Sequence, residues 1–182
     1  MALLPILTAP DPRLKRKALP VDSVDAAVVR LMNDMLETMY AAPGIGLAAP
    51  QVGVSRQVIV VDPAREGEEP RPLRLANPRI VWTSEETSPY EEGCLSLPEQ
   101  FETVVRPSRV KVAYLDETGA GREIEADGLL AVVLQHEIDH LEGTLFVDHL
   151  SALRRGMVMR RLKKMMRSGP SRERAPAKGV VA

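Results

Sequence analysis

The segment HEIDH, residues 136–140, places two histidines and a glutamate at a spacing that suits metal-assisted hydrolysis. On an α-helix, residues four positions apart lie on one face, so His136 and His140 can point at the same ion. Glu137 lies one position round the helix from His136, where it can reach a coordinated water without being a ligand itself. The pattern is short and also arises by chance in helices, so its surroundings decide its weight.

The residues around this motif predict a buried helix. The segment DGLLAVVLQHEIDHLEG, residues 127–143, is apolar on nearly every face, which is typical of a helix inside a core. Asp127 can cap its start, and Gly143 can adopt the left-handed conformation that often ends a helix. Ionisable side chains in such a helix are costly unless they are paired or bind a metal. This conflict is the strongest functional signal in the chain.

A catalytic metal site usually needs a third protein ligand and one open position. The longer metallopeptidase pattern HExxHxxGxxH matches as far as Gly143, but its last position here is Phe146, which cannot ligate. A glutamate on a following helix is also missing, because residues 151–168 contain no acidic side chain. His149 and Asp148 lie beyond the glycine break, and both are expected to be ordinary surface or loop residues.

Cys94 is the only cysteine in the 182 residues, and it lies in the segment YEEGCLSLPE, residues 90–99. One interpretation is a small buried hydrophobic residue, since free cysteines are often buried and inert. The other is metal binding, because a thiolate suits Zn²⁺ or Fe²⁺ and would complete a Cys-His-His set. A single cysteine cannot form an internal disulfide, which favours a reducing, intracellular setting.

The spacing of apolar residues and the positions of turn residues predict a further helix and several strands within residues 21–128. The segment 21–44 has apolar residues at helical spacing, its methionines are expected in the core, and Asp22 or Ser23 can cap it. Short strands are predicted within residues 56–63, 75–84 and 104–128, the last with a turn at 116–121. A helix followed by mostly strands lacks the regular alternation of a parallel-sheet fold.

Charge is divided unevenly along the chain. Residues 1–150 have 14 basic against 24 acidic side chains, a net −10, whereas residues 151–182 have 10 against 1, a net +9. We predict a single catalytic domain over residues 1–150, a basic helix over 151–168 and a disordered tail over 169–182. The basic helix either packs its apolar residues on the domain or docks on a polyanion, and the two are compatible. The apolar residues in question are Leu153, Met157, Leu162 and Met165.

The start of the chain has no basic region before its short apolar run, and Pro5 interrupts that run. The sequence therefore predicts neither a signal peptide nor a membrane span. With the single cysteine, this favours a cytoplasmic protein.

Three blocks together resemble the signature motifs of the peptide deformylases: GIGLAAPQ at residues 44–51, EGCLS at 92–96 and QHEIDH at 135–140. They follow the family's order, and the similarity extends from about Leu4 to Ser168. The resemblance implies an α+β fold, in which antiparallel strands wrap around a central buried HExxH helix, with an N-terminal helix and a basic C-terminal helix. It also implies a metal-dependent hydrolase that removes the N-formyl group from the formyl-methionine of nascent polypeptides and releases formate.

The resemblance assigns the roles of individual residues. One divalent metal ion, typically Fe²⁺ with Zn²⁺ or Ni²⁺ as substitutes, would be held by Cys94, His136 and His140. Glu137 would be the general acid and base. Gln51 and the backbone N–H of Leu95 would stabilise the oxyanion, whereas Glu92 is expected to be structural.

Substrate and partner are expected from the same resemblance. An extended peptide would approach the glycine-containing blocks closely, and apolar side chains would line a pocket for the methionine. The residues expected to bind substrate are Ile45, Gly46, Leu47, Gly93, Val132 and Val133. The basic C-terminal helix would contact ribosomal RNA near the exit site of the nascent chain.

The residues leave two alternatives open beside a deformylase. An HExxH metallopeptidase would use the same motif, but its usual third ligands are missing. A non-enzymatic, metal-stabilised module could instead bind nascent chains or the ribosome through the basic helix. In that module Glu137 would be dispensable, which separates it from any hydrolase.

Overall fold

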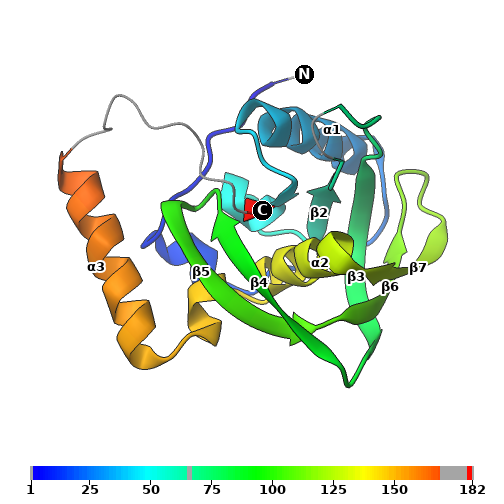
Figure 1. Cartoon of the computed structure of the whole chain (residues 1–182). Coiled ribbons are helices and arrows are strands. Elements are labelled where there is room, and N and C mark those ends of the chain that lie inside the picture. The colour runs from blue at the N-terminus through cyan, green and yellow to red at the C-terminus, as the bar shows by residue number, and fades with distance from the viewer. Residues whose placement is uncertain (1, 65–66, 169–179, 182) are drawn as a thin grey trace.

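Two β-sheets lie on either side of a central helix, α2 (Gly128–Leu141), in the computed structural model (Figure 1). The structure describes residues 2–64, 67–168 and 180–181. One sheet has the strand order β1-β2-β3-β6-β7, with antiparallel neighbours throughout. The other has the order β5-β4-β8. This α+β architecture, with antiparallel strands around a buried HExxH helix, confirms the fold expected from the sequence.

Besides α2, the described residues form five helices and eight strands. The remaining helices are η1 (Pro12–Lys15), α1 (Ala26–Ala41), η2 (Ala49–Val52), η3 (Phe146–His149) and α3 (Ala152–Ser168). The strands are β1 (Gly46–Ala48), β2 (Val58–Val61), β3 (Leu73–Thr83), β4 (Thr87–Cys94), β5 (Leu97–Pro107), β6 (Arg109–Leu115), β7 (Gly121–Asp127) and β8 (Val180–Val181).

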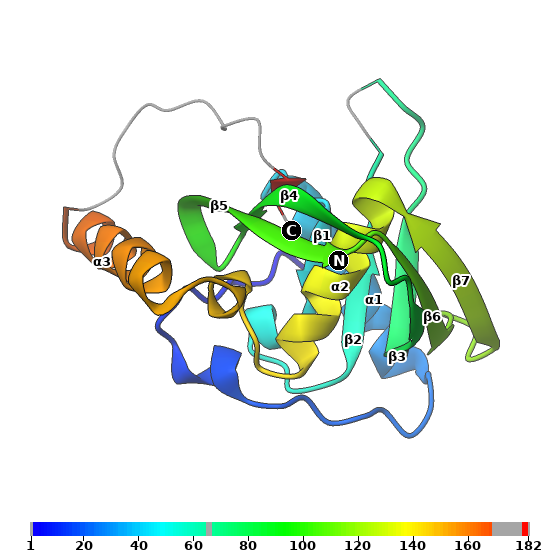
Figure 2. The same cartoon turned by 60° about the horizontal axis from the view of Figure 1, so that its bottom comes forward.

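The five-stranded sheet is buried on both faces at β1 and β2, with α1 against one face and α2 against the other (Figure 2). Strand β2 shows why, because its side chains alternate between two cores. Val58 and Val60 pack with the methionines of α1, whereas Ile59 and Val61 pack with α2. The sheet therefore fixes α2 in the interior, and the metal-binding motif with it.

Helix α1 begins later than predicted. Its cap is Asp25, whose carboxylate accepts hydrogen bonds at 2.9 Å from the backbone N–H groups of Ala27 and Val28. The prediction of Asp22 or Ser23 as the cap was wrong because the preceding backbone is tied to β3. There the side chain of Asn77 both accepts from the N–H of Val21 and donates to its carbonyl, each at 2.8 Å.

Strand β4 was not predicted, although it ends at Cys94. Its sequence TSPYEEGC is poor in the β-branched and aromatic residues that favour strands. Long antiparallel pairing with β5 specifies it instead, from Thr87 opposite Pro107 to Cys94 opposite Leu97. The cysteine therefore stands at the end of a hairpin strand.

Helix α3 forms where the sequence predicted a basic helix. Of the four apolar residues expected to pack on the domain, Leu162 is buried and Met165 packs partly buried on the same core, next to the buried Val158. The prediction was wrong for Leu153 and Met157, which are 72% and 45% exposed. The predicted tail falls largely outside the described residues. At Val180–Val181, however, the chain forms strand β8 on β4, so the prediction of disorder was wrong at these two positions.

Candidate metal centre

Cys94, His136 and His140 converge on one point inside the protein. Their candidate ligand atoms all lie within 4.8 Å of one another, and all three side chains are buried. The Sγ atom of Cys94 lies 3.3 Å from Nε2 of His140. Helix α2 supplies both histidines from successive turns, and the end of β4 supplies the thiol. The structure therefore brings together the three residues that the sequence singled out.

The ring of His136 is held in a fixed orientation by Glu92. Its Nδ1 atom lies 2.9 Å from Oε2 of Glu92, and its Nε2 atom is buried without a hydrogen-bond partner among the described residues. A carboxylate on the far nitrogen of a histidine is the usual support of a metal ligand, because it fixes the tautomer that leaves Nε2 free to bind. Glu92 thus has a definite role beside the cluster.

Burial acts on the protonation of two of these side chains, Cys94 and His140. It raises the pKa of the Cys94 thiol and lowers the pKa of His140 well below its ordinary value, with His136 adding to the second effect. Both groups are therefore neutral, and the thiol must lose its proton when it binds a cation. Two imidazoles and one thiolate form a donor set that suits Fe²⁺ or Zn²⁺. The residues present fit a metal ion.

Glu137 points into the same space without a partner. Both of its carboxylate oxygens are buried and make no hydrogen bond within the described part of the chain. Burial raises the pKa of Glu137 well above its ordinary value, and the nearby charge of Glu92 adds to this. A buried, unpaired carboxyl group with a raised pKa is typical of a general acid and base.

Gln51, in η2, is fully buried and has its amide held at both ends. Its Oε1 accepts a hydrogen bond at 2.8 Å from the N–H of Ala48, so its Nε2 points towards the cluster. That nitrogen lies 3.5 Å from Sγ of Cys94 and 3.3 Å from Oγ of Ser96. The arrangement presents a neutral donor beside the candidate ligands.

The residues predicted to bind substrate lie around the cluster in different ways. Gly46 on β1 faces Glu137 and Val133, whereas the side chain of Leu47 packs fully buried in the core with α1. Gly93 lies in β4 directly before Cys94, with the ring of Phe101 against it. Val132 is buried one turn before His136, and Ile45 packs partly buried on the core around α2. Their roles stay predictions.

A buried chain of charges behind Glu92 was missed from the sequence. Arg106 on β5 donates to both oxygens of Glu92, at 2.5 and 3.0 Å, and to Oδ2 of Asp139 at 2.8 Å. Asp139 in turn lies 2.7 Å from Nε2 of His149. His149 therefore lies away from the metal ligands, and its contact ties η3 to α2.

The contact between Glu92 and His136 leads to a prediction about the stability of the protein in acid. Burial favours the neutral form of Glu92, but hydrogen bonds with His136 and Arg106 outweigh it and lower the pKa of Glu92 to about 2, from an ordinary 4.5. Its stabilising effect is therefore complete above about pH 4.5 and is lost as the pH falls towards 2. We expect Glu92→Gln to flatten the pH dependence of the unfolding free energy, measured in urea between pH 6 and 3. An equally steep dependence in both proteins would contradict this.

Gly46 leaves no room for a side chain, which gives a second prediction. A Cβ atom there would lie 2.3 Å from Oε1 of Glu137 and 2.8 Å from Cγ1 of Val133. Gly46→Ala must therefore displace the carboxylate, and we expect kcat of the amide hydrolysis proposed below to fall about a hundredfold, as for loss of a general base. Gly156→Ala is the control, because outside its own stretch of helix no described residue lies within 4 Å of a Cβ atom placed there, and its kcat should be unchanged. Equal activity in the two variants would refute the crowding argument.

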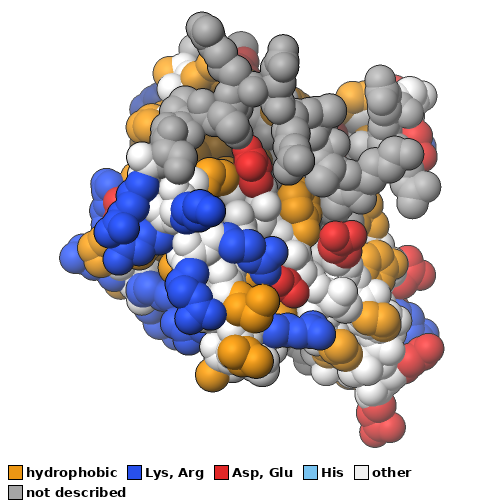
Figure 3. Space-filling view, turned by 60° about the vertical axis from the view of Figure 1, so that its left-hand side comes forward, with side chains coloured by type: hydrophobic (Ala, Val, Ile, Leu, Met, Phe, Trp, Pro, Cys, Tyr) orange, Lys and Arg blue, Asp and Glu red, His pale blue; other side chains and the backbone are white. Residues whose placement is uncertain are grey.

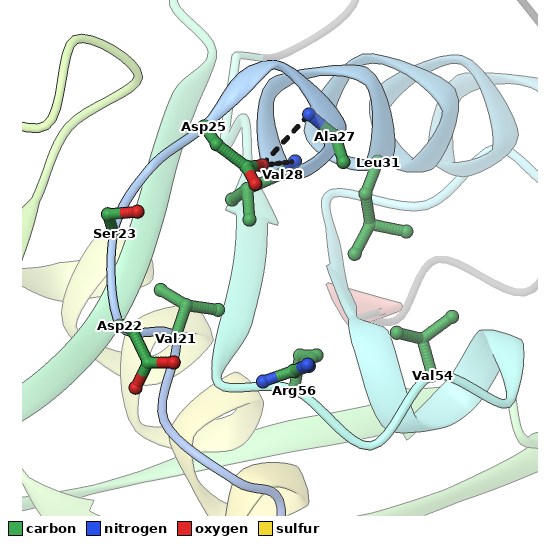
Figure 4. Close-up of a pocket in the computed structure, with 9 residues that line it drawn as sticks. All are labelled: Val21, Asp22, Ser23, Asp25, Ala27, Val28, Leu31, Val54 and Arg56. Carbon is green, nitrogen blue, oxygen red and sulfur yellow. Dashed lines mark hydrogen bonds between the residues drawn. The ribbon is translucent and has the colours of Figure 1, made fainter.

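A separate surface pocket lies at the start of α1 (Figure 4). It has a volume of about 300 Å³ and none of the three candidate ligands lines it. Its polar groups serve the fold: Asp25 caps α1, and Arg56 donates to the carbonyl of Pro20 at 3.4 Å. The candidate ligands lie elsewhere, at the buried cluster.

Comparison with known proteins identifies the family to which this chain belongs. The sequence profile described as polypeptide deformylase matches residues 3–156. The chain belongs to the polypeptide deformylase family. A peptide deformylase of Phenylobacterium zucineum is 57% identical over 164 residues, covering 90% of this chain and 97% of that protein. One of Methylocella silvestris is 58% identical, covering 90% and 85% of the two chains.

Solved structures agree with the sequence comparison. The crystal structure of a peptide deformylase from Ehrlichia chaffeensis in complex with actinonin has a TM-score of 0.87 and 44% identity, and the match covers 92% of this chain and 99% of that one. Membership of the deformylase family confirms the enzyme class expected from the three sequence blocks. It favours neither the metallopeptidase nor the non-enzymatic module.

Proposed function

We propose that this deformylase holds one Fe²⁺ ion through Cys94, His136 and His140 and hydrolyses the formyl amide of N-formyl-methionyl peptides. The observation that supports the proposal most is the buried convergence of these three residues beside Glu137, whose carboxylate has no hydrogen-bond partner among the described residues. A divalent cation at that point supplies Lewis-acid chemistry, polarising the amide carbonyl and lowering the pKa of a coordinated water to about 7.

Three groups near the cluster would carry out proton transfer and stabilise the oxyanion. Glu137 takes a proton from the attacking water and later delivers it to the departing amine, for which its raised pKa is suited. Nε2 of Gln51 and the backbone N–H of Leu95 donate to the oxyanion that develops on the formyl oxygen. One such donor is typically worth about 3 kcal/mol of transition-state stabilisation.

An extended peptide would reach this site between the two sheets. β1 is an edge strand of the five-stranded sheet, and β4 leads directly to Cys94. Gly46 lies beside Glu137, and Gly93 precedes the thiol, so a peptide adding to these edges through its backbone would bring its formyl group to the cluster. Val132 and Val133 would line the pocket for its methionine side chain.

Metal exchange tests the choice of ion. The protein would be prepared without oxygen, stripped with a chelator and reloaded with Fe²⁺, Zn²⁺ or Ni²⁺. We expect formate release to be lost on stripping and restored most fully by Fe²⁺, with rapid decay in air because the thiolate ligand oxidises. An iron-loaded protein slower than the zinc-loaded one would overturn the assignment of iron.

We also propose that α3 docks on ribosomal RNA. All seven Lys and Arg side chains of the helix are exposed, and Figure 3 shows basic side chains gathered on this side of the molecule. Val158 and Leu162 hold the helix on the domain, so its basic face is presented on a rigid support. Contacts between such a face and phosphates release counterions and weaken steeply with salt. A cytoplasmic location at the nascent chain follows from this partner.

Charge removal on α3 tests the docking. We expect Arg154→Gln, Arg160→Gln and Lys163→Gln together to weaken ribosome binding more than tenfold and to reduce the salt slope by roughly one per lost phosphate contact. The control removes three exposed arginines elsewhere, Arg30, Arg71 and Arg79, and should bind nearly as wild type. Equal weakening in both triple variants, measured by cosedimentation at several salt concentrations, would count against a role of α3.

Within the described residues, none of the helices combines the length and the apolar character needed to cross a membrane.

A further inference from the structure

The chain's own C-terminal strand lies on β4. Val180 pairs with Glu92 and Val181 with Gly93, in a parallel arrangement. β5 occupies one edge of β4, so β8 occupies the other, and the red strand lies beside β4 in both views (Figures 1 and 2). The paired residues directly precede Cys94.

This edge is also the one at which a formylated peptide would add, if the proposed function is correct. Backbone N–H and C=O groups on a strand edge can pair with only one strand at a time. We propose that β8 and the formylated peptide compete for the edge of β4 at Glu92–Gly93, so that the C-terminus restrains the enzyme in cis.

The direction of β8 makes it a competitor and not a substrate. β4 runs towards Cys94, and a parallel strand runs the same way. A formylated peptide must instead present its N-terminus at Cys94 and extend away from it, antiparallel to β4. β8 therefore fills the edge without bringing any N-terminal formyl group to the cluster.

A short stretch of sequence joins β8 to α3. Eleven residues separate Ser168, at the end of α3, from Val180. A short tether of this kind gives a local concentration in the millimolar range. Two paired residues make few hydrogen bonds, each of modest net value, so the occupied and open forms should differ only several-fold in population. A restraint of this size raises KM and leaves kcat unchanged, because saturating peptide displaces the strand.

Full-length variants that differ only in backbone pairing test the proposal. Val180→Pro with Val181→Pro removes the N–H groups and prevents pairing, whereas Val180→Ala with Val181→Ala keeps them. We expect the proline variant to show a KM for formyl-methionyl peptide about fivefold lower than wild type, with the same kcat. The alanine variant should keep a KM much closer to that of wild type.

Addition in trans gives an independent measurement. A synthetic peptide of residues 169–182 should inhibit the proline variant competitively, with an inhibition constant near or below a millimolar. Equal KM values in wild type and the proline variant, or no inhibition by the peptide, would overturn the proposal. Absence of formate release from every variant would instead refute the proposed function, so the two failures are distinguishable.

Discussion

Glu137→Gln is expected to lower kcat for formate release about a thousandfold while the protein keeps its metal ion. The substitution removes the group that accepts and returns a proton, and such groups typically contribute 10²–10⁴-fold. Because both oxygens of Glu137 lack partners among the described residues, the amide of glutamine replaces no existing hydrogen bond. The fold and the ligands should therefore be undisturbed.

Glu142→Gln is the matched control for this result. Glu142 follows the same helix but is exposed, and its carboxylate pairs with Lys17. Its kcat should stay within about twofold of wild type, as for an exposed ion pair of little energetic weight. Metal content by elemental analysis and kcat by formate release would be measured on the same preparations. Turnover retained in Glu137→Gln would contradict the proposed proton transfer.

Arg106→Met is expected to lower the free energy of unfolding by about 3–5 kcal/mol, the usual cost of breaking a buried ion pair by removing one partner. The Arg106 side chain is 6% exposed, and its guanidinium lies between two carboxylates, those of Glu92 and Asp139. Without it, Glu92 loses one of the two partners that lower its pKa, and only the hydrogen bond with His136 then holds its carboxylate in place. Metal affinity should therefore fall as well, by the 10–100-fold typical of lost support for a metal ligand.

Arg161→Met provides the comparison for Arg106. Arg161 also pairs with a glutamate, Glu102 at 2.8 Å, but its own side chain is 55% exposed. Such a pair is worth less than about 1 kcal/mol, and no metal ligand depends on it. Urea unfolding and competition with a metal chelator would separate the two variants. A similar small loss in both would mean that the buried charges do not support the metal centre.

Local sequence was sufficient for those parts of the site that lie on one helix. His136, Glu137 and His140 share a continuous segment whose apolar neighbours fix both its structure and its burial. Cys94 could be added because it is the only cysteine, and hence the only thiolate ligand, in the chain. The methionines of α1 were likewise predictable as core residues from helical spacing.

Parts of the site that depend on strand pairing were not predictable in the same way. β4 has weak strand propensity, and its place depends on a partner that follows it in sequence. The position of Arg106 next to both Glu92 and Asp139 requires the register of that hairpin and its packing on α2. One signal was available: Glu92 and Cys94 are two residues apart, so in a strand they share a face. No sequence signal of this kind was available for β8, because two valines in a tail are too few to show the alternation of a strand.

The measurement that tests the central claim most directly is formate release from a short formyl-methionyl peptide, with and without a chelator, using protein purified without oxygen. We predict rapid release that the chelator abolishes, with all internal peptide bonds intact. Cleavage of an internal bond would mean that the cluster serves a peptidase. No formate from a protein with one bound metal ion per chain would mean that Cys94, His136 and His140 hold the ion for another purpose.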